Sequence, residues 1–123
     1  MEYHYFGAFL KAKRREREIP VRLMAEIIGV SPGYYCDIEK GRKYPPNREM
    51  LDKILLELRL SDEDKAIFFD LAGKARSEAP PDLPEYINQN EVVRVALRLA
   101  KDTGDSDDWK YFIDRLQKKK KDE

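Results

Sequence analysis

Residues 19–46 read IPVRLMAEIIGVSPGYYCDIEKGRKYPP, and this stretch decides how the chain folds. It predicts two short helices joined by a tight turn at Gly29, because glycine tolerates the left-handed backbone that ends a helix. Pro20 suits the first position of the first helix, where its missing N–H has no partner. Apolar residues then recur at i, i+3, i+4 and i+7, which predicts one buried stripe: Val21, Met24, Ala25 and Ile28.

The second helix is expected to begin at Ser31, a good N-cap, with Pro32 in its first turn. Tyr35, Ile38 and Glu39 follow at a spacing that turns them toward the first helix, and Gly41 ends the element before a basic loop. Two helices joined in this way can place the second one in the major groove of DNA.

The same residues resemble the Cro/CI-type (XRE) helix-turn-helix regulators. The family pattern, roughly L-A-x-x-x-G-V-S-x-x-Y-L-S-x-I-E-x-G-x-R-x-P-P, appears here as MAEIIGVSPGYYCDIEKGRKYPP. Upstream, Phe6-Gly7 and residues 10–14 resemble the first helix of the family. Downstream, the resemblance to its fourth helix rests on Leu51, Ile54, Leu55 and Leu58.

The resemblance covers about the first 60 residues and shows three departures. Pro20-Val21 stands where the family often has Thr-Gln, and Cys36 stands where it often has Ser. A Gln or Arg that is frequent among the base-facing positions is absent. The departures leave the expected fold unchanged and bear on the DNA contacts.

An all-α fold is expected, because no period-2 run is long enough to predict a strand. The resemblance implies a five-helix lambda-repressor-like helix-turn-helix domain, over residues 1–76. The Pro-rich residues 77–84 predict a linker, and residues 85–123 predict a C-terminal helical region. The first helix is expected from about residue 5 to residue 18, and the predicted caps of the later helices are Asn47, Ser61, Asn90 and Ser106.

The C-terminal region is expected to mediate dimerisation or to bind a partner. Its roughly 40 residues carry two apolar stripes and are too few to be stable with both exposed. The first helix of residues 19–46 also carries a second apolar pair, which a neighbour could cover or which could be stray surface residues. The predicted dimer or partner residues are Leu23, Ile27, Val93, Leu97, Trp109, Phe112 and Leu116.

Composition gives no overall basic signature, since the 123 residues contain 24 Lys and Arg and 24 Asp and Glu. The halves differ: residues 1–60 hold twelve basic against nine acidic side chains, and residues 61–123 hold twelve against fifteen. A basic first half beside an acidic second half suits a nucleic-acid-binding unit joined to a partner-binding unit.

Cysteine and histidine usage argues against a metal site and a disulfide. Cys36 and His4 are the single Cys and the single His, and one of each in separate segments cannot complete a zinc shell. No metal and no cofactor are therefore expected. The start of the chain lacks the order of a signal peptide, and no apolar run would span a membrane. These features predict a cytoplasmic protein, associated with the bacterial nucleoid when bound to DNA.

Phosphate contacts and base contacts are expected from different residues. The predicted phosphate ligands lie at the start of either helix and in the loop after them, a loop that could also be ordinary basic surface: Arg22, Ser31, Lys40, Arg42, Lys43 and Tyr44. The resemblance implies base-facing positions at Pro32, Gly33, Tyr34 and Asp37. None of these is Arg, Lys, Asn or Gln, so affinity should depend mainly on phosphate contacts and DNA shape. The resemblance also implies a structural ion pair between Arg14 and Glu39.

No nucleophile–base pair, Gly-rich phosphate loop or metal spacing is present in the sequence, so an enzyme is not expected. The leading prediction is a sequence-specific DNA-binding transcriptional regulator, a repressor in the manner of the family. It would act as a homodimer on a two-fold operator, reading it with the helix at residues 32–40. The alternative is a prophage-type interaction protein, antitoxin-like or controlled by a peptidase, whose second half binds a toxin or a metallopeptidase.

Overall fold

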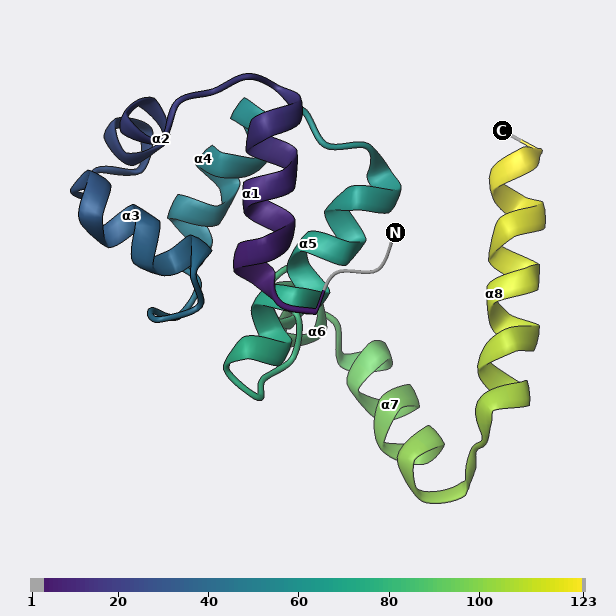
Figure 1. Ribbon diagram of the computed structural model, residues 1–123. Coiled ribbons are helices and arrows are strands. Elements are labelled where there is room, and N and C mark those ends of the chain that lie inside the picture. The colour runs from purple at the N-terminus through teal and green to yellow at the C-terminus, as the bar shows by residue number, and fades with distance from the viewer. Residues whose placement is uncertain (1–3, 123) are drawn as a thin grey trace. The chain divides into compact units, whose positions relative to one another are not determined.

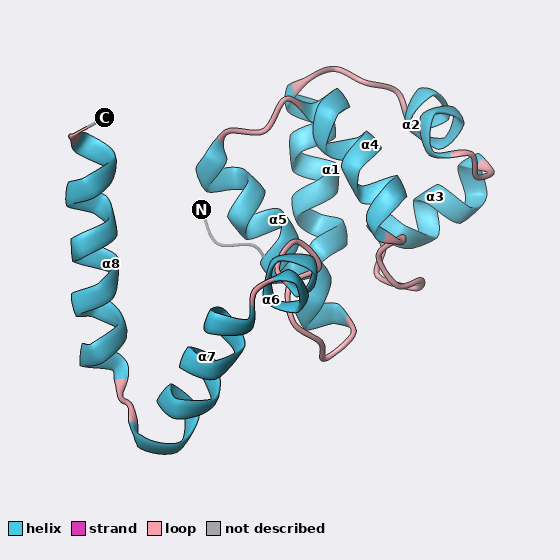
Figure 2. Cartoon of the chain, turned by 180° about the vertical axis from the view of Figure 1, so that it is seen from behind, coloured by secondary structure: helices cyan, strands magenta, loops and turns pink. Residues whose placement is uncertain are grey.

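The computed structural model describes residues 4–122, and every regular element in that range is an α-helix (Figures 1 and 2). The predicted all-α class is therefore confirmed. The chain divides into two compact units, at residues 1–84 and 85–123. The elements are α1 (Phe6–Glu16), α2 (Val21–Ile28), α3 (Pro32–Glu39), α4 (Arg48–Leu58), α5 (Asp62–Ala75), α6 (Pro84–Gln89), α7 (Glu91–Thr103) and α8 (Ser106–Lys121).

Helix α1 lies at the centre of the first unit, where it packs against α3 and α5, while α2 packs against α3 and α4 (Figure 1). Each of the five helices contributes apolar side chains to one core. The largest fully buried side chains are Tyr35, Phe9, Phe68, Leu10, Met24, Ile28, Ile38, Leu51, Ile54 and Leu58. The buried stripes predicted for α2 and α4 supply five of these, so the periodicity of the sequence identified the core face of both helices.

An aromatic cluster fixes α5 against α1. The ring of Phe68 lies 5.2 Å from Phe6 and 6.3 Å from Phe9, measured between centroids. Phe69 is also buried, with its ring 5.3 Å from Phe68. The apolar residues that the sequence offers for this helix, Ile67, Phe68, Leu71 and Ala72, predict Ile67 in the core instead of Phe69, but Ile67 is 40% exposed. Residues 67 and 69 flank Phe68 about equally around the helix, so periodicity could not choose between them.

Three predicted N-caps are confirmed. The backbone N–H of Tyr34 donates to Ser31 Oγ at 3.1 Å, that of Met50 to Asn47 Oδ1 at 3.0 Å, and that of Asp64 to Ser61 Oγ at 3.2 Å. Each bond satisfies a donor that has no partner inside its helix, so these caps fix where α3, α4 and α5 begin.

Three predicted helix ends are wrong by a small margin. Pro20 is the N-cap of α2, which begins at Val21, and α1 ends at Glu16 because Glu18 adopts a φ of 55°. Asp105, not Ser106, caps α8, and it forms a reciprocal capping box with Asp108. The carboxylate accepts from two backbone N–H groups, which a single hydroxyl at the next position would not match.

A fourth predicted cap differs in its bonding. Asn90 occupies the N-cap position of α7, but its side chain makes no cap bond there. Instead, its Nδ2 donates to the carbonyl of Tyr86 at 2.7 Å. The side chain therefore closes the end of α6.

The Pro-rich residues 77–84 run against the first unit. A Cβ at Gly73 in α5 would meet the backbone of Ala79 and Pro80 at 2.8 Å. The guanidinium of Arg48 in α4 donates to the carbonyl of Pro81 at 2.8 Å. This segment is therefore held on α4 and α5 as far as Pro81. How function divides between residues 1–76, 77–84 and 85–123 stays a prediction, and the outermost limits lie outside residues 4–122.

The second unit contains α6, α7 and α8, and none of their side chains is buried. Arg94 joins α7 to the end of α6, since its Nη1 donates to the carbonyls of Ile87 and Asn88 at 2.9 and 2.6 Å. Across residues 4–122, no helix is both long and apolar enough to span a membrane.

Candidate nucleic-acid interface

Helix α3 is held by one face and leaves its other face open. Tyr35 and Ile38 are fully buried, and Glu39 is 6% exposed. On the outer side, Pro32 and Gly33 are exposed, and Tyr34 is 43% exposed. Asp37, the fourth base-facing position implied by the family resemblance, is partly exposed. The four positions thus lie on the side of α3 that does not enter the core.

The turn between α2 and α3 is tight because of Gly29, which adopts a φ of 77°. The N–H of Val30 donates to the carbonyl of Ala25 at 3.0 Å, closing the end of α2. Ala25 is 1% exposed, and its small side chain lies where α2 packs on α3 and α4. Short side chains at such a crossing let two helix axes approach closely. This packing sets the position of α3 relative to α2.

A buried ion pair fixes the other end of α3. Arg14 of α1 donates from Nε and Nη2 to the two carboxylate oxygens of Glu39, at 2.7 and 3.0 Å. Its Nη1 donates to the carbonyl of Ile19 at 2.9 Å. These bonds to Glu39 raise the pKa of Arg14, and burial raises the pKa of Tyr35 one turn earlier. The bidentate geometry ties α1 to α3 with a defined orientation.

A backbone contact also joins α1 to the end of α3. Gly7 is buried, and a Cβ there would overlap the carbonyl oxygens of Ile38 and Glu39. Only a residue without a side chain permits this approach. The first turn of α1 therefore supports the last turn of α3 directly.

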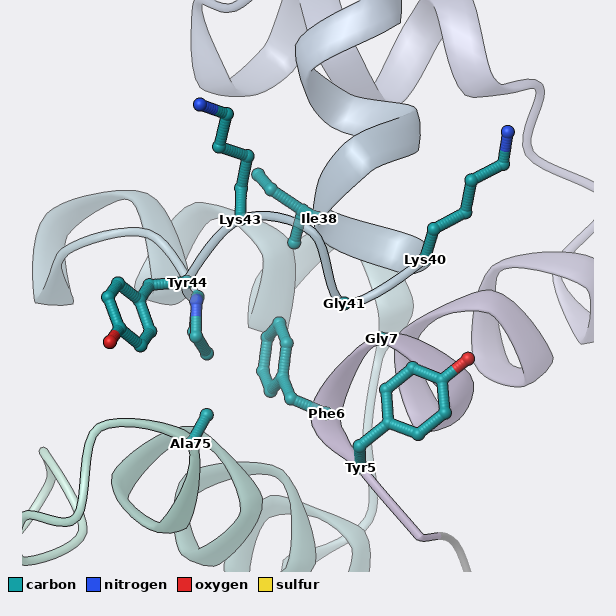
Figure 3. A pocket seen from close by; sticks show the side chains of 10 residues that line it. Tyr5, Phe6, Gly7, Ile38, Lys40, Gly41, Lys43, Tyr44 and Ala75 are labelled. Atoms are coloured by element: carbon teal, nitrogen blue, oxygen red, sulfur yellow. The ribbon is translucent and has the colours of Figure 1, made fainter.

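The loop after α3 presents most of the predicted phosphate ligands. Gly41 adopts a φ of 78°, and the N–H groups of Arg42 and Lys43 donate back to the carbonyl of Asp37 at 2.8 and 3.2 Å. Lys40, Arg42, Lys43 and Tyr44 are all exposed. Figure 3 shows Lys40 and Lys43 leaving the loop on opposite sides of Gly41. The folded loop thus displays three cations around one helix end.

Two side-chain contacts connect this loop to the outer face of α3. The guanidinium of Arg42 lies 3.7 Å from the carboxylate of Asp37, and the ammonium of Lys43 lies 5.9 Å from the ring centroid of Tyr34. Both contacts join a predicted phosphate ligand to a predicted base-facing residue. The other two phosphate ligands lie at helix starts: Arg22 is exposed in the first turn of α2, and Ser31 uses its hydroxyl in the cap.

One residue of this surface, Tyr5, was not predicted from any sequence pattern. Tyr5 is 46% exposed, and two of its ring carbons lie 3.5 and 3.6 Å from where a Cβ of Gly41 would be. It lines a hollow of about 470 Å³ together with Lys40, Lys43 and Tyr44 (Figure 3). The contact joins positions more than thirty residues apart, so local patterns could not reveal it.

The predicted dimer or partner residues fall in both units. Leu23 is 42% exposed on α2, and Ile27 is partly buried against the core of the first unit. Val93 is partly exposed and Leu97 is 37% exposed, both on α7. Three further exposed side chains lie on α8: Trp109, Phe112 and Leu116.

Among the described residues, no group of three or more His, Cys, Asp or Glu side chains is arranged to hold a metal ion. Cys36 is a free, partly exposed thiol on α3. It lines a smaller hollow of about 250 Å³ between α1 and α3, with Lys11, Arg15 and Lys40 among its neighbours.

Comparison with known proteins found relatives of residues 10–64, the part of the chain that contains this surface. Residues 10–64 match the family model described as Helix-turn-helix. The "ImmF control region 10 kDa protein" of Bacillus phage phi105 is 39% identical over 54 residues, which are 44% of this chain and 59% of that protein. The match thus spans less than two thirds of that relative. The crystal structure of the clp gene regulator ClgR from Corynebacterium glutamicum is 26% identical, with 81% of this chain and 92% of that chain covered, at a TM-score of 0.45. Residues 10–64 of the chain, which contain the α2–α3 pair and its basic loop, therefore carry a helix-turn-helix domain similar to that of the Cro/CI (XRE) type.

Proposed function

We propose that the chain is a sequence-specific DNA-binding transcriptional regulator, a repressor that reads a two-fold operator with α3. The observation that carries the proposal is the outer face of α3: it is exposed, and Arg42 and Lys43 contact it through Asp37 and Tyr34. Two more exposed cations lie near the helix-turn-helix pair, Lys40 at the end of α3 and Arg22 in the first turn of α2, and the Arg14–Glu39 pair anchors α3 to α1. Residues 10–64 match the Helix-turn-helix family model, and the phage relative carries a control-region title, which both support a regulator.

Affinity in this proposal comes mainly from phosphate. Each phosphate that a Lys or Arg neutralises releases counterions, so binding falls with salt by about 0.9 in log–log slope per contact. The four basic side chains above would give a slope of roughly −3 to −4 for one protomer. Tyr44 and the N–H groups at the capped start of α3 supply uncharged phosphate donors.

Sequence choice in this proposal comes from few base contacts. Asp37 can accept from a cytosine amino group, and Tyr34 or Pro32 can contact a thymine methyl. Gly33 has no neighbour within 4 Å of the place a Cβ would take, so the backbone of α3 can approach a groove closely there. The remaining discrimination would follow the shape and deformability of the DNA.

The test is selection of duplexes from a random pool by the full chain, carried out at low and at moderate salt. A regulator of this kind retains duplexes, loses them steeply with salt, and enriches sites with two half-sites about 10 base pairs apart. Lys43→Ala should weaken retention, while Lys101→Ala in α7, the same change outside residues 10–64, should not. Failure to retain any duplex in dilute buffer, or enrichment of no sequence, would reject the proposal.

A further inference from the structure

Helix α8 has an apolar stripe that nothing in its own unit covers. Trp109 is 38% exposed, Phe112 44%, Ile113 49% and Leu116 46%, and no residue of α8 is buried. Helix α7, which precedes α8 across Gly104-Asp105, does not pack along it. The four apolar side chains recur at i, i+3, i+4 and i+7, so they form one face.

An uncovered helix of this length needs a partner to be stable. Isolated helices shorter than about 12–15 residues are marginal in water even when rich in alanine, and most helical stability in proteins comes from packing an apolar face. Helix α8 has 16 residues. Its capping box at Asp105 and Asp108 fixes its start but buries no apolar surface. The stripe itself is where a second helix would add stability.

The charges of α8 are segregated along its length. Its first turn and cap carry Asp105, Asp107 and Asp108, and its last turn carries four consecutive lysines, Lys118–Lys121. Two copies aligned in parallel would set lysines against lysines and aspartates against aspartates. Two antiparallel copies would set each acidic end beside the basic end of the other. Charge complementarity therefore favours a second copy of α8 as the partner, in the antiparallel orientation.

The positions of these residues agree with a two-fold axis at the middle of the stripe. That midpoint lies between Phe112 and Ile113, and Trp109 and Leu116 are equally far from it, as are Asp105 and Lys120. At about 100° per residue, Lys120 continues the apolar face and Lys119 borders it, on the same side as Asp108. Lys118 and Lys121 point more than about 120° away from the centre of that face.

We propose that α8 pairs antiparallel with α8 of a second copy of this chain. Trp109 of each copy packs beside Leu116 of the other, and Lys119 and Lys120 of each lie against Asp105 and Asp108 of the other. The pairing would supply the dimer contact of the proposed regulator, so its functional role rests on that proposal. The experiments below test the pairing itself, whether or not the chain binds DNA.

Cross-linking of the full chain tests the orientation. Cys36→Ser removes the native thiol, and single cysteines are then placed in α8. Ile113→Cys, beside the two-fold axis, should form a disulfide between two copies under mild oxidation. Lys120→Cys should not link to itself, because antiparallel copies hold these positions about 22 Å apart along the helix, beyond disulfide reach. A mixture of Trp109→Cys and Leu116→Cys chains should link to each other more than to themselves.

Charge reversal tests the proposed complementarity. Lys119→Glu/Lys120→Glu should raise the dimer dissociation constant at least about tenfold at low salt, since it sets four glutamates against aspartates. Lys118→Glu/Lys121→Glu makes the same change in net charge on the far face and should leave that constant within about twofold. Sedimentation equilibrium measures both, and circular dichroism checks that α8 remains helical.

Each alternative has its own signature, and each overturns the inference. Self-linking by Lys120→Cys means parallel pairing. Absence of any Ile113→Cys link means that α8 is covered by another surface or stays single. If both double lysine variants raise the dimer dissociation constant equally, the net charge of the chain, and not the proposed contact, controls association. If the links form as expected but duplexes are not retained, the α8 pairing stands and the regulator proposal falls.

Discussion

The Nη1 atom of Arg42 lies 3.7 Å from Oδ1 of Asp37, across the turn that ends α3. One of these residues is a proposed phosphate ligand, and the other is proposed to face the bases. The two roles compete, because a guanidinium held toward Asp37 is less free to reach a phosphate. Both side chains are more than one third exposed, so the pair contributes little to stability and its effect should be seen in DNA binding.

Asp37→Asn should therefore strengthen binding to all duplexes at low salt. It releases Arg42 and removes a negative charge from the face that meets DNA, so the log–log salt slope should steepen by up to about 0.9. Asp70→Asn, the same change at an exposed position of α5, serves as the control. Fluorescence anisotropy across a salt series measures both. Unchanged affinity for random duplexes would show that Arg42 does not contact phosphate.

Lys43→Ala and Tyr34→Ala should separate affinity from sequence choice, although the two side chains are in contact. Loss of Lys43 should weaken every duplex by a similar factor and reduce the salt slope by about 0.9. Loss of Tyr34 should change the ranking of sequences, with a penalty of about 1–3 kcal/mol at the position it reads. Competition between selected and scrambled duplexes gives both quantities. If Tyr34→Ala preserves the ranking, the base-facing role is wrong.

Replacing one partner of the Arg14–Glu39 pair should cost more than replacing both. Arg14→Met or Glu39→Met leaves a buried group without its partner, which typically costs about 3–5 kcal/mol of unfolding free energy. Arg14→Met with Glu39→Met removes both charges and should cost less than either single change. Urea denaturation of the four chains gives the coupling energy. A coupling near zero would mean that the pair does not stabilise the fold.

Gly7→Ala should destabilise the first unit, because the added methyl would overlap the carbonyl oxygens of Ile38 and Glu39. The backbone must shift, at a cost of about 1–3 kcal/mol. Gly33→Ala is the matched control, since a Cβ there meets nothing within 4 Å. It should leave the unfolding free energy unchanged or slightly higher while weakening duplex binding. The contrary result, a stable Gly7→Ala variant, would place α1 and α3 further apart than described.

The stability of the first unit should fall as pH rises above about 10. Burial raises the pKa of Tyr35 above the ordinary 10.0, so the folded state keeps a proton that the unfolded state releases. The stabilisation is complete below pH 10 and decreases above it, by up to about 1.4 kcal/mol per pH unit. Chemical denaturation between pH 8 and 11 measures the slope. In Tyr35→Phe, the slope of unfolding free energy against pH should be smaller than in the parent chain. Equal slopes in the two chains would show that Tyr35 is not the cause.

Local chemistry in the sequence determines much of the first unit. Ser31 and Asn47 are caps because a short polar side chain can accept from the third residue beyond it, and the structure has both bonds. The stripe of α4 likewise follows from a period of 3.6 residues, with Leu51, Ile54 and Leu58 buried.

Other features depend on distant contacts that no local pattern contains. Ser106 and Asp105 are both good caps, and the choice between them follows from the reciprocal bonds with Asp108. Phe69 replaces Ile67 in the core because it joins the ring cluster around Phe68. Tyr5 reaches the loop at Gly41 only because α1 crosses the end of α3.

The contact of Gly7 with the end of α3 has a consequence for how new binding preferences could arise. Because main chain rests on main chain, the tilt of that helix does not depend on the identity of any side chain pointing outward. Positions 32, 33, 34 and 37 could then be exchanged as a set, with the scaffold beneath them unaltered. Such a scaffold would acquire a different target by substitution alone.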